Sequence, residues 1–458
     1  MTEAWIVGGA LRDELLGRRV TDIDIAVHGD AGRPARALAA EVGGPSFRLS
    51  EAFGAWRVID RDAGRVYDVS TLQGPTIEAD LALRDFTVNA MARPVAELSV
   101  AALREPVAGA DLVDPLGGRI DLEARTLRVI GPEAYESDPL RALRLARFVA
   151  ELAFEPDAET ERLTRAAAPR VVDAAGERVF AELRRLVLGP NVIGGLEVAD
   201  RLDLLRAILP ELVELHDVEQ SHYHHLDVYG HTIEVLEHLL ELEAQASGRL
   251  RAALDEPLAD ELTRGEALRF GALLHDIGKP ATHAVREKGR VTFMGHDRLG
   301  EQMVRDLCRR LRTSERFSRF VEGVTRHHLV LGFLVHERPL DRRAVYRYLR
   351  RTEPVEVEVT LLSCADRLAT RGRKADEAIA AHMELAEELM EAALDWREQG
   401  RPAPLLRGDE LARELGIEPG PELGKLLAEL EEAAYAGEVT TRGEALGFAR
   451  RLRQNSLW

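Results

Sequence analysis

The order of hydrophobic and polar positions at the start of the chain predicts a strand, a turn, a helix and a second strand. A short apolar run at residues 5–7 meets the glycine pair Gly8 and Gly9. A helical pattern then covers residues 10–16, and residues 21–27 read as a second strand that carries two carboxylates.

Two carboxylates on the second predicted strand suit a divalent metal. Successive side chains of a strand point to opposite faces, so we expect Asp22 and Asp24 on one face and Ile23 in the core. Mg²⁺ takes one or two carboxylates and completes its octahedron with water and phosphate oxygens. Gly8 and Gly9 let the backbone approach a triphosphate at the start of the helix. The alternative is a solvated strand end and an ordinary glycine turn.

Two further strands are predicted at residues 54–60 and 64–70, as an antiparallel pair around a short turn. Asp68 lies on the second of these strands. It is either a third acidic group of the metal site or a carboxylate that faces solvent.

Length and composition predict several, mostly helical domains. The 458 residues exceed what one core usually supports, and aromatic residues are only 5% of the chain. Cys308 and Cys364 fall in helical patterns and are expected to be buried thiols, which fits a reducing cytoplasm. No window approaches the roughly 18 apolar residues of a membrane span. We therefore expect a cytoplasmic protein without a membrane partner.

The net charge of −18 argues against a general nucleic-acid coat, because binding to phosphates relies on Lys and Arg. Residues 301–351, however, contain thirteen arginines and six acidic residues. This segment offers a local basic face to RNA, or it is an ordinary solvated helical surface.

The string GGALRDELLGR at residues 8–18, followed by DID at residues 22–24, resembles the first motif of class II tRNA nucleotidyltransferases. These are the CCA-adding enzymes, whose relatives are the bacterial poly(A) polymerases. The resemblance implies a polymerase-β-like head that joins nucleoside monophosphates to an RNA 3′ end. The residues it implies are Asp22 and Asp24 for catalysis with Mg²⁺, and Gly8, Gly9, Arg12 and Asp13 for nucleotide binding.

Residues 83–91, LRDFTVNAM, resemble the second motif of the family, usually written RRDFTxNA. The resemblance implies that Arg84 binds phosphate, that Asp85 accepts a hydrogen bond from a 2′-OH, and that Asn89 lies beside them. The first arginine of the pattern is Leu83 here, which weakens the expected triphosphate clamp.

Residues 137–148, SDPLRALRLARF, resemble the EDxxR motif of the family and its helix. Asp138 and Arg141 are three residues apart, so an acceptor and a donor are expected to point together at the Watson–Crick edge of a base. The resemblance implies that such side chains select C and later A, and Arg144 joins this nucleotide-binding set. Ser137 replaces the Glu that normally orients the arginine. The alternative for Asp138 is a helix N-cap.

Two further features bear on the head. Arg178 and Glu182 resemble the last head-and-neck motif and are expected to brace the neck together, because they are four residues apart. Between Ser70 and Asp80 the family commonly carries a longer, arginine-rich loop, and only residues 71–79 remain here. In the family, loss of that loop is associated with enzymes that add only the two C residues.

Histidines and aspartates in the middle of the chain form a second set, spaced along successive helical patterns. They resemble the HD phosphohydrolase fold, whose four-ligand signature is matched in order by His231, His275, Asp276 and Asp366. A second metal is expected on His296 and on one of His327 and His328, of which we take His327. The alternatives for His222, His224 and His225 are extra ligands, helix caps or an exposed loop.

The resemblance covers nearly the whole chain and predicts an α+β protein with four parts. They are a nucleotidyltransferase head with a mixed sheet (1–125), an all-α neck that binds nucleotide and RNA (126–215), an HD-type metal-binding helical domain (216–400) and a helical C-terminal region (401–458).

The predicted function is template-independent addition of C and A residues, as CCA or CC, to the 3′ end of tRNA by two-metal nucleotidyl transfer. A phosphohydrolase activity is expected in the HD domain. CC addition alone, poly(A) polymerisation, and an HD phosphohydrolase with an RNA-binding head stay open as alternatives. The expected ligands are tRNA, CTP, ATP, Mg²⁺ in the head and a divalent metal of open identity in the HD domain.

Overall fold

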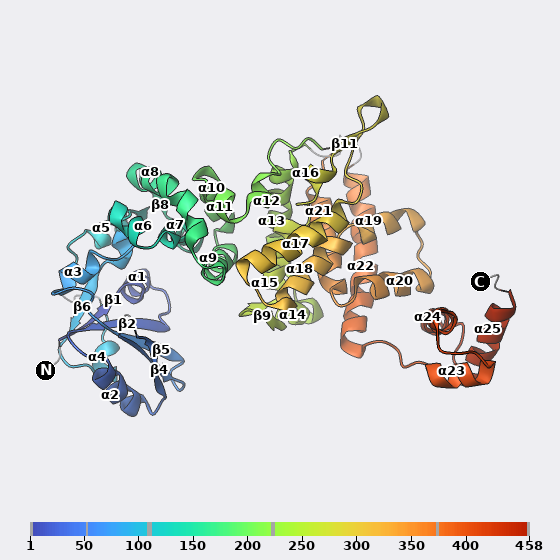
Figure 1. Cartoon of the computed structure of the whole chain (residues 1–458), viewed down its shortest axis with the longest axis horizontal. Coiled ribbons are helices and arrows are strands. Elements are labelled where there is room, and N and C mark those ends of the chain that lie inside the picture. Colours follow the sequence, from blue (N-terminus) through green and yellow to red (C-terminus); the bar gives the residue numbers. More distant parts are fainter. Residues whose placement is uncertain (1–2, 52–53, 108–111, 221–224, 372–374, 456–458) are drawn as a thin grey trace. The chain divides into compact units, whose positions relative to one another are not determined.

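The computed structural model describes residues 3–51, 54–107, 112–220, 225–371 and 375–455. The chain folds into two compact units, residues 1–208 and 209–458, which Figure 1 shows coloured along the sequence. The first unit contains a six-stranded sheet with helices, and the second is mainly helical. The predicted α+β class is confirmed. The domain limits at residues 125, 215 and 400 stay predictions.

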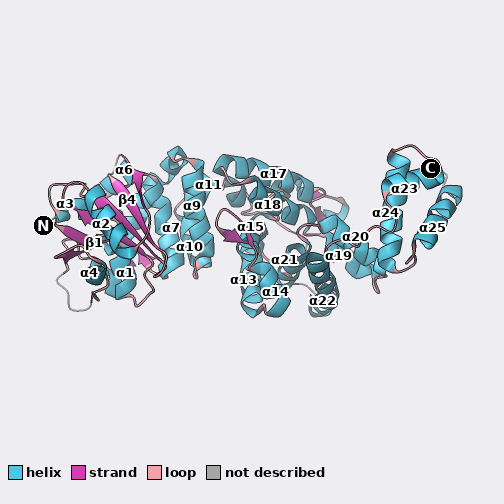
Figure 2. Cartoon of the chain, turned by 90° about the horizontal axis from the view of Figure 1, so that it is seen from below, coloured by secondary structure: helices cyan, strands magenta, loops and turns pink. Residues whose placement is uncertain are grey.

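The sheet of the N-terminal unit has the strand order β3-β4-β5-β2-β1-β6. The strands are β1 (Ala4–Val7), β2 (Asp22–Val27), β3 (Ser46–Ser50), β4 (Ala55–Asp60), β5 (Arg65–Thr71) and β6 (Ala92–Val95). β2 and β5 run parallel, and the other neighbours are antiparallel. The predicted strand–helix–strand start and the antiparallel β4–β5 pair are confirmed. Figure 2 shows most of the strands gathered in this unit.

The alternation along β2 separates a hydrophobic core from a polar site. Ile23 and Ile25 join the core that α1, α2 and α4 cover on one face of the sheet. On the other face, Ala26 packs beneath α3, whereas Asp22 and Asp24 are exposed. These helices are α1 (Gly9–Leu15), α2 (Gly32–Val42), α3 (Ile77–Leu81) and α4 (Val100–Leu103). The first half of β2 therefore presents its carboxylates to solvent.

Helices complete the N-terminal unit after the sheet. They are α5 (Gly118–Glu123), α6 (Pro132–Ser137), α7 (Leu140–Leu152), α8 (Ala158–Ala167), α9 (Gly176–Leu188), α10 (Val192–Arg201) and α11 (Leu204–Ile208), with a short pair of strands, β7 (Thr126–Leu127) and β8 (Glu155–Pro156). α7 is almost wholly buried and packs against α9 and α10. This packing fixes the side chains that α7 directs to the site.

The C-terminal unit begins with a helical bundle. Its helices are α12 (Pro210–Val213), α13 (Val228–Gln245), α14 (Gly248–Leu254), α15 (Arg264–Leu274), α16 (Lys279–Thr282), α17 (His296–Leu311), α18 (Glu315–His327), α19 (Val330–Leu334), α20 (Arg342–Thr352), α21 (Glu356–Leu368) and α22 (Ala375–Gln399). Its short strand pairs are β9 (Pro257–Ala259) with β10 (Leu262–Thr263), and β11 (Ala284–Val285) with β12 (Val291–Thr292). α13 packs against α15 and α21, and α18 packs against α15 and α17.

A buried ion cluster ties three helices of this bundle together. The carboxylate of Glu358 on α21 forms ion pairs with Arg264 of α15 at 2.6 Å and with Arg397 of α22 at 3.0 Å. Burial alone would raise the pKa of the Glu358 carboxyl, but the two guanidinium groups bring it below its ordinary value. The cluster thus fixes the positions of helices that carry the histidines and aspartates of the second candidate site.

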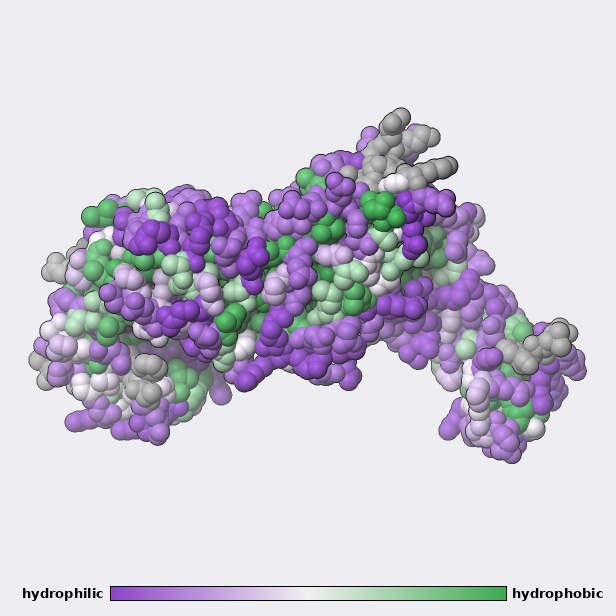
Figure 3. Space-filling view, turned by 45° about the horizontal axis from the view of Figure 1, so that its top comes forward, coloured by the Kyte–Doolittle hydropathy of each residue, from purple (hydrophilic) through white to green (hydrophobic). Residues whose placement is uncertain are grey.

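The last three helices share a small hydrophobic cluster of their own. They are α23 (Gly408–Leu415), α24 (Pro421–Ala436) and α25 (Arg442–Asn455), and Pro421 stands at the first turn of α24 as helix starts favour. Hydrophilic residues form most of the face seen in Figure 3. Across the described ranges, we find no helix with the length and apolar content needed to cross a membrane.

Candidate functional site

The two carboxylates of β2 lie in a cavity of about 550 Å³, which we call the carboxylate cavity. Residues from the start of α1, from β2, from the segment after α3, and from α7 and α9 line it. They are Gly8, Gly9, Ala10, Arg12, Asp13, Asp22, Asp24, Arg84, Asp85, Asn89, Arg141, Arg144, Arg147, Phe148, Glu182 and Arg185. The structure thus brings the predicted head residues together around one cavity, with the exception of Asp138.

Asp24 belongs to a row of charged side chains that crosses three neighbouring strands. It pairs in register with Asp68 of β5, which in turn pairs with Arg57 of β4. The Arg57 guanidinium donates to both oxygens of Asp68, at 2.8 Å each. Asp68 is therefore held by Arg57 and is not part of the cavity lining.

The pKa of the Asp24 carboxyl lies above its ordinary value, although the side chain reaches solvent. The protein packed around this position limits its hydration and raises the pKa, the guanidinium of Arg84 lowers it, and the carboxylates of Asp68 and Asp22 raise it further. A cation bound between the carboxylates would relieve this repulsion. The donor set of two exposed carboxylates on one strand face therefore fits a divalent metal.

Gly8 allows a close approach between the backbone and the cavity side chains. Its φ of +74° lies in the left-handed region, and a Cβ at this position would lie 2.8 Å from Nη1 of Arg84 and 3.7 Å from Oδ2 of Asp24. Its amide donates to the carbonyl of Met91 at 3.2 Å. A side chain here would displace Arg84.

Gly8→Ala is expected to lower kcat/KM for nucleotide addition by about 10- to 100-fold, because it moves Arg84 relative to Asp24. The positive φ should also lower the free energy of unfolding by about 1–2 kcal/mol. Gly17→Ala is the matched control, because Gly17 has φ +68° and nothing within 4 Å of an added Cβ. Steady-state kinetics and denaturant unfolding of both variants check this. Equal activity losses in the two variants would contradict it.

A polar network connects the start of α1 to the segment after α3. Arg12 donates to both oxygens of Asp13, at 2.9 and 2.8 Å, and to Oδ1 of Asn89 at 2.6 Å. The amide of Asn89 donates to Oδ1 of Asp85 at 2.9 Å. Arg12 and Asn89 are thus buried links of the network.

The same network continues into α7 and α9. Nη1 of Arg144 donates to Oδ2 of Asp85 at 3.2 Å, and Nε of Arg144 donates to Glu182 at 3.0 Å. Nε of Arg147 lies 3.0 Å from the other oxygen of Glu182. Burial would raise the pKa of the Asp85 carboxyl, but Arg144, Asn89 and the amide of Phe86 bring it below its ordinary value. Asp85 stays charged and holds Arg144 in place.

Arg84 and Arg141 both reach the cavity from fixed positions. Arg84 donates to Oδ2 of Asp80 at 3.1 Å, while Leu83, which stands where the family pattern has an arginine, is 55% exposed. Nη1 of Arg141 donates to the carbonyls of Arg84 and Ala134 at 3.2 and 3.3 Å, and to the hydroxyl of Ser137 at 3.2 Å. Ser137 therefore contacts the arginine that a Glu is expected to orient.

The expected pairing of Asp138 with Arg141 is wrong, and the two neck residues of α9 bind other partners than each other. Asp138 has an extended backbone between α6 and α7, and its carboxylate pairs with Arg178 at 2.7 Å. It does not share a helical face with Arg141, nor does it line the cavity. Arg178 and Glu182 do not bind each other, but both brace the neck, because Arg178 of α9 binds Asp138 and Glu182 of α9 binds Arg144 and Arg147 of α7.

The sequence patterns missed the lining residues Arg147, Phe148 and Arg185, and they assigned Glu182 to the neck and not to the cavity. Arg147 repeats the three-residue spacing of Arg141 and Arg144 along α7, and this spacing was the available signal. Glu182 and Arg185 come from α9, whose packing against α7 is a tertiary feature.

A second candidate site lies in the C-terminal unit. We call it the histidine–aspartate cluster, and its members are His231, His275, Asp276, His296, His328 and Asp366. Ligand atoms of His231, His275 and Asp276 lie within 4.8 Å of one another, and so do those of Asp276, His296 and His328. Nε2 of His231 lies 3.0 Å from Oδ1 of Asp366. Asp276 belongs to both groups of three, so its carboxylate is shared between them.

Hydrogen bonds to the backbone orient three histidine rings of the cluster. Nδ1 of His275, His296 and His328 faces the backbone carbonyl three residues earlier, at 2.8, 2.7 and 2.7 Å. Because Nδ1 of each ring donates to a carbonyl, Nε2 is the nitrogen that faces the cluster and can act as the ligand. This donor set fits divalent metal ions.

Asp276 is the centre of the cluster and is 1% exposed. Burial would raise its pKa, but His275 and Lys279 hold it well below the ordinary value. Nζ of Lys279 lies 2.6 Å from Oδ2 of Asp276 and donates to Gln220 at 2.8 Å. Lys279 was missed from the sequence, although it lies one turn after Asp276.

The choice of His327 as a ligand is wrong. His328 faces the cluster, with its Nε2 3.2 Å from that of His296 and 3.7 Å from Oδ1 of Asp276. His327 is the last residue of α18, and one residue changes the direction of a helical side chain by about 100°. Burial and the nearby Arg326 and Arg351 lower the pKa of His327 to about 4.

Of the three histidines before α13, the structure describes only His225. His222 and His224 lie outside the described residues. Nε2 of His225 lies 3.8 Å from Glu234, and His225 belongs to neither group of candidate ligands in the described part of the chain.

Three family models match the chain. Residues 4–128 match the poly A polymerase head domain, residues 153–215 match the probable RNA and SrmB-binding site of polymerase A, and residues 228–371 match the HD domain. The first and third matches contain the carboxylates of β2 and the histidine–aspartate cluster.

Curated relatives match the chain over nearly its full length. The A-adding tRNA nucleotidyltransferase of Deinococcus radiodurans is 39% identical, over 98% of this chain and 95% of its own. The CC-adding enzyme of Thermus thermophilus is 35% identical, over 97% of this chain and 93% of its own. The CCA-adding enzyme of Thermotoga maritima, solved with tRNA, has a TM-score of 0.61 at 20% identity, over 98% of this chain and 91% of its own. With this identity over this coverage, the chain belongs to the tRNA nucleotidyltransferase family.

Proposed function

We propose that the N-terminal unit transfers nucleotides from CTP or ATP to the 3′ end of tRNA without a template. The observation that carries this proposal is the carboxylate cavity, in which Asp22 and Asp24 face a group of fixed arginines. The names of the two curated relatives support the same reaction.

In the proposed reaction the RNA 3′-OH attacks the α-phosphorus of the nucleotide, and pyrophosphate leaves. Asp22 and Asp24 would hold Mg²⁺, which when bound activates the attacking oxygen and stabilises charge on the leaving oxygen. Arg84 and Arg144 bind and orient the triphosphate, because their guanidinium groups match phosphate geometry. The network through Asn89, Asp85 and Glu182 keeps Arg144 rigid, so little ordering is needed when the nucleotide binds.

Two observations bear on which nucleotides the protein adds. β5 ends at Thr71 and α3 begins at Ile77, so a short connection replaces the longer loop, which favours CC addition. The amide of Gln73 donates to Asp80 at 2.8 Å, and this bond fixes the connection. The Deinococcus radiodurans relative, in contrast, is named for A addition.

A tRNA that lacks its three terminal nucleotides, and one that lacks only the last, separate the possibilities. Each is incubated with CTP alone, ATP alone or both, and the products are sized to one nucleotide. On the RNA that lacks three nucleotides, a CC-adding enzyme stops after CC and a CCA-adding enzyme completes CCA. On the RNA that lacks only the last nucleotide, an A-adding enzyme adds the single A. We expect one of these three results. A long A tail from ATP alone would identify a poly(A) polymerase, and no extension of either RNA would contradict the proposed function.

A second proposed activity belongs to the histidine–aspartate cluster. Two groups of three ligands that share Asp276 suit hydrolysis of a phosphate ester. We propose that RNA 3′ ends bearing a 2′,3′-cyclic or terminal phosphate are the substrates. Lys279, which contacts Asp276, would bind a non-bridging phosphate oxygen.

A further inference from the structure

A second pocket of the N-terminal unit lies on the sheet face opposite the carboxylates. We call it the arginine pocket, and its volume is about 570 Å³. Ile6, Ile23 and Leu103 give it an apolar base, and its rim includes the segment between α1 and β2 and the turn before β5. Ile23 follows Asp22 on β2, so the alternation of the strand separates this pocket from the carboxylate cavity.

The lining of the arginine pocket carries excess positive charge. Arg18, Arg19, Arg65 and Arg104 line it, and Glu14 is the one acidic residue among the described lining residues. Oε1 of Glu14 accepts a hydrogen bond from the amide of Val107 at 2.7 Å. Among the described residues this carboxylate forms no ion pair with an arginine, so one acidic charge stands against four guanidinium groups in the lining.

Three of these arginines have no counter-ion in the part of the chain that the structure describes. Within the described residues, the side chains of Arg18, Arg19 and Arg65 form no ion pair or hydrogen bond, whereas Arg104 lies 3.4 Å from Asp60. The chain has 79 acidic and 61 Lys and Arg residues, so acidic partners are abundant. Even in the basic segment 301–351, Arg305 pairs with Glu322 at 2.6 Å and Arg310 with Glu211 at 2.7 Å. Unneutralised arginines around a concave pocket attract an external anion.

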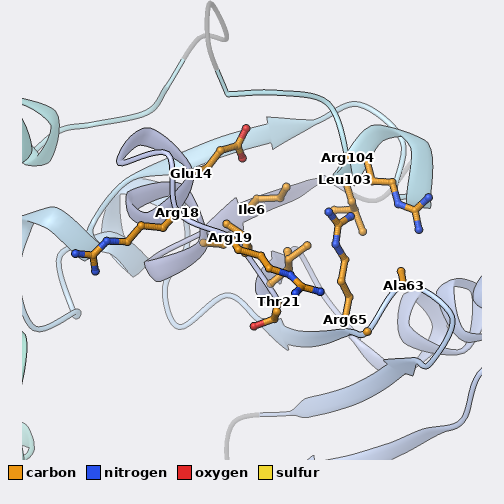
Figure 4. Close-up of a pocket in the computed structure, with 13 residues that line it drawn as sticks. Ile6, Glu14, Arg18, Arg19, Thr21, Ala63, Arg65, Leu103 and Arg104 are labelled. Atoms are coloured by element: carbon orange, nitrogen blue, oxygen red, sulfur yellow. The ribbon is translucent and has the colours of Figure 1, made fainter. Parts of the chain in front are cut away.

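The shape of the pocket indicates the kind of anion. Figure 4 shows Arg19 and Arg65 reaching into the same space, while Arg18 points away from it. Guanidinium groups bind phosphates through paired hydrogen bonds, and the volume falls within the usual range of small-molecule sites, about 300–1,000 Å³. A single phosphate would leave most of this space empty. We propose that the arginine pocket binds a small phosphorylated molecule of nucleotide size, with its phosphates on Arg19 and Arg65 and its organic part on the apolar base.

Chemical modification of arginines tests this on the full-length protein. Phenylglyoxal is added without divalent metal, with and without ATP, inorganic pyrophosphate or a short RNA, and mass spectrometry follows each arginine. At a ligand concentration ten times the dissociation constant, ATP should slow modification of Arg19 and Arg65 by about tenfold. Arg33 and Arg61, which are exposed and lie outside the pocket, should react at unchanged rates.

The three ligands distinguish the sources of phosphate. Protection by ATP, alone or together with pyrophosphate, supports a small-molecule site. Protection by RNA alone, or by no ligand, would overturn the proposal. As a second measurement, Arg19→Ala with Arg65→Ala should lose one bound equivalent of ATP in calorimetry, whereas Arg33→Ala with Arg61→Ala should keep it. Equal stoichiometry in the two variants would also overturn the proposal, whether or not nucleotide addition is observed.

Discussion

A chain with both Asp22→Ala and Asp24→Ala is expected to lose nucleotide addition by at least about 1,000-fold, or about 4 kcal/mol of transition-state stabilisation. These side chains are the exposed carboxylates at the centre of the carboxylate cavity, where a divalent metal would offset charge on the triphosphate. Their removal should lower the free energy of unfolding by no more than about 0.5 kcal/mol, because both side chains reach solvent and the neighbouring carboxylates repel Asp24. Incorporation of labelled CMP and AMP into tRNA, and thermal unfolding, measure the two quantities.

The matched control is Asp62→Ala with Glu97→Ala. Both residues are exposed in the same unit, and the pair changes the net charge by the same amount. Activity close to wild type is expected in this control. Comparable losses in the two double variants would show that overall charge, and not the carboxylate cavity, determines the rate.

Asp276→Asn is expected to abolish metal binding in the C-terminal unit and to lower its phosphohydrolase activity by at least about 100-fold. Asp276 is shared by both groups of candidate ligands, and an amide of the same shape offers a much weaker ligand than a carboxylate. Nucleotide addition to tRNA should be unchanged. Metal content by mass spectrometry, and hydrolysis of an RNA 2′,3′-cyclic phosphate, are the measurements.

Neighbouring histidines provide the control for this second prediction. His328→Asn should lose metal together with Asp276→Asn, because the Nε2 atom of His328 faces Asp276 and His296. His327→Asn should retain both metal and hydrolysis. The reverse pattern would refute the assignment of His328 to the histidine–aspartate cluster.

Local patterns predicted the parts of the structure that depend on neighbours in sequence. The two-residue period of the strand predicted at residues 21–27 indicated the faces of β2, and the glycine pair indicated the turn before α1. The convergence of Asp22, Arg84 and Arg144 on one cavity followed from a family resemblance, because these residues lie on separate elements.

Other features depend on how the elements pack and could not be predicted from the sequence. The pairing of Asp68 with Arg57 results from the register of β4 and β5, which the strand pattern leaves open. Asp138 accepts a hydrogen bond from Arg178, because it is an extended residue between the separate helices α6 and α7. The direction of a histidine at the end of α18 depends on how the helix rotates against its neighbours, so the sequence could not choose between two adjacent positions.

Anomalous diffraction from Mn²⁺ tests the central claim most directly. Crystals of the full-length protein would be soaked with MnCl₂ and a non-hydrolysable CTP analogue. We predict an anomalous peak at about 2.1 Å from oxygen atoms of both Asp22 and Asp24, in contact with phosphate oxygens of the nucleotide. A bound nucleotide with no metal peak between these two carboxylates would contradict the account.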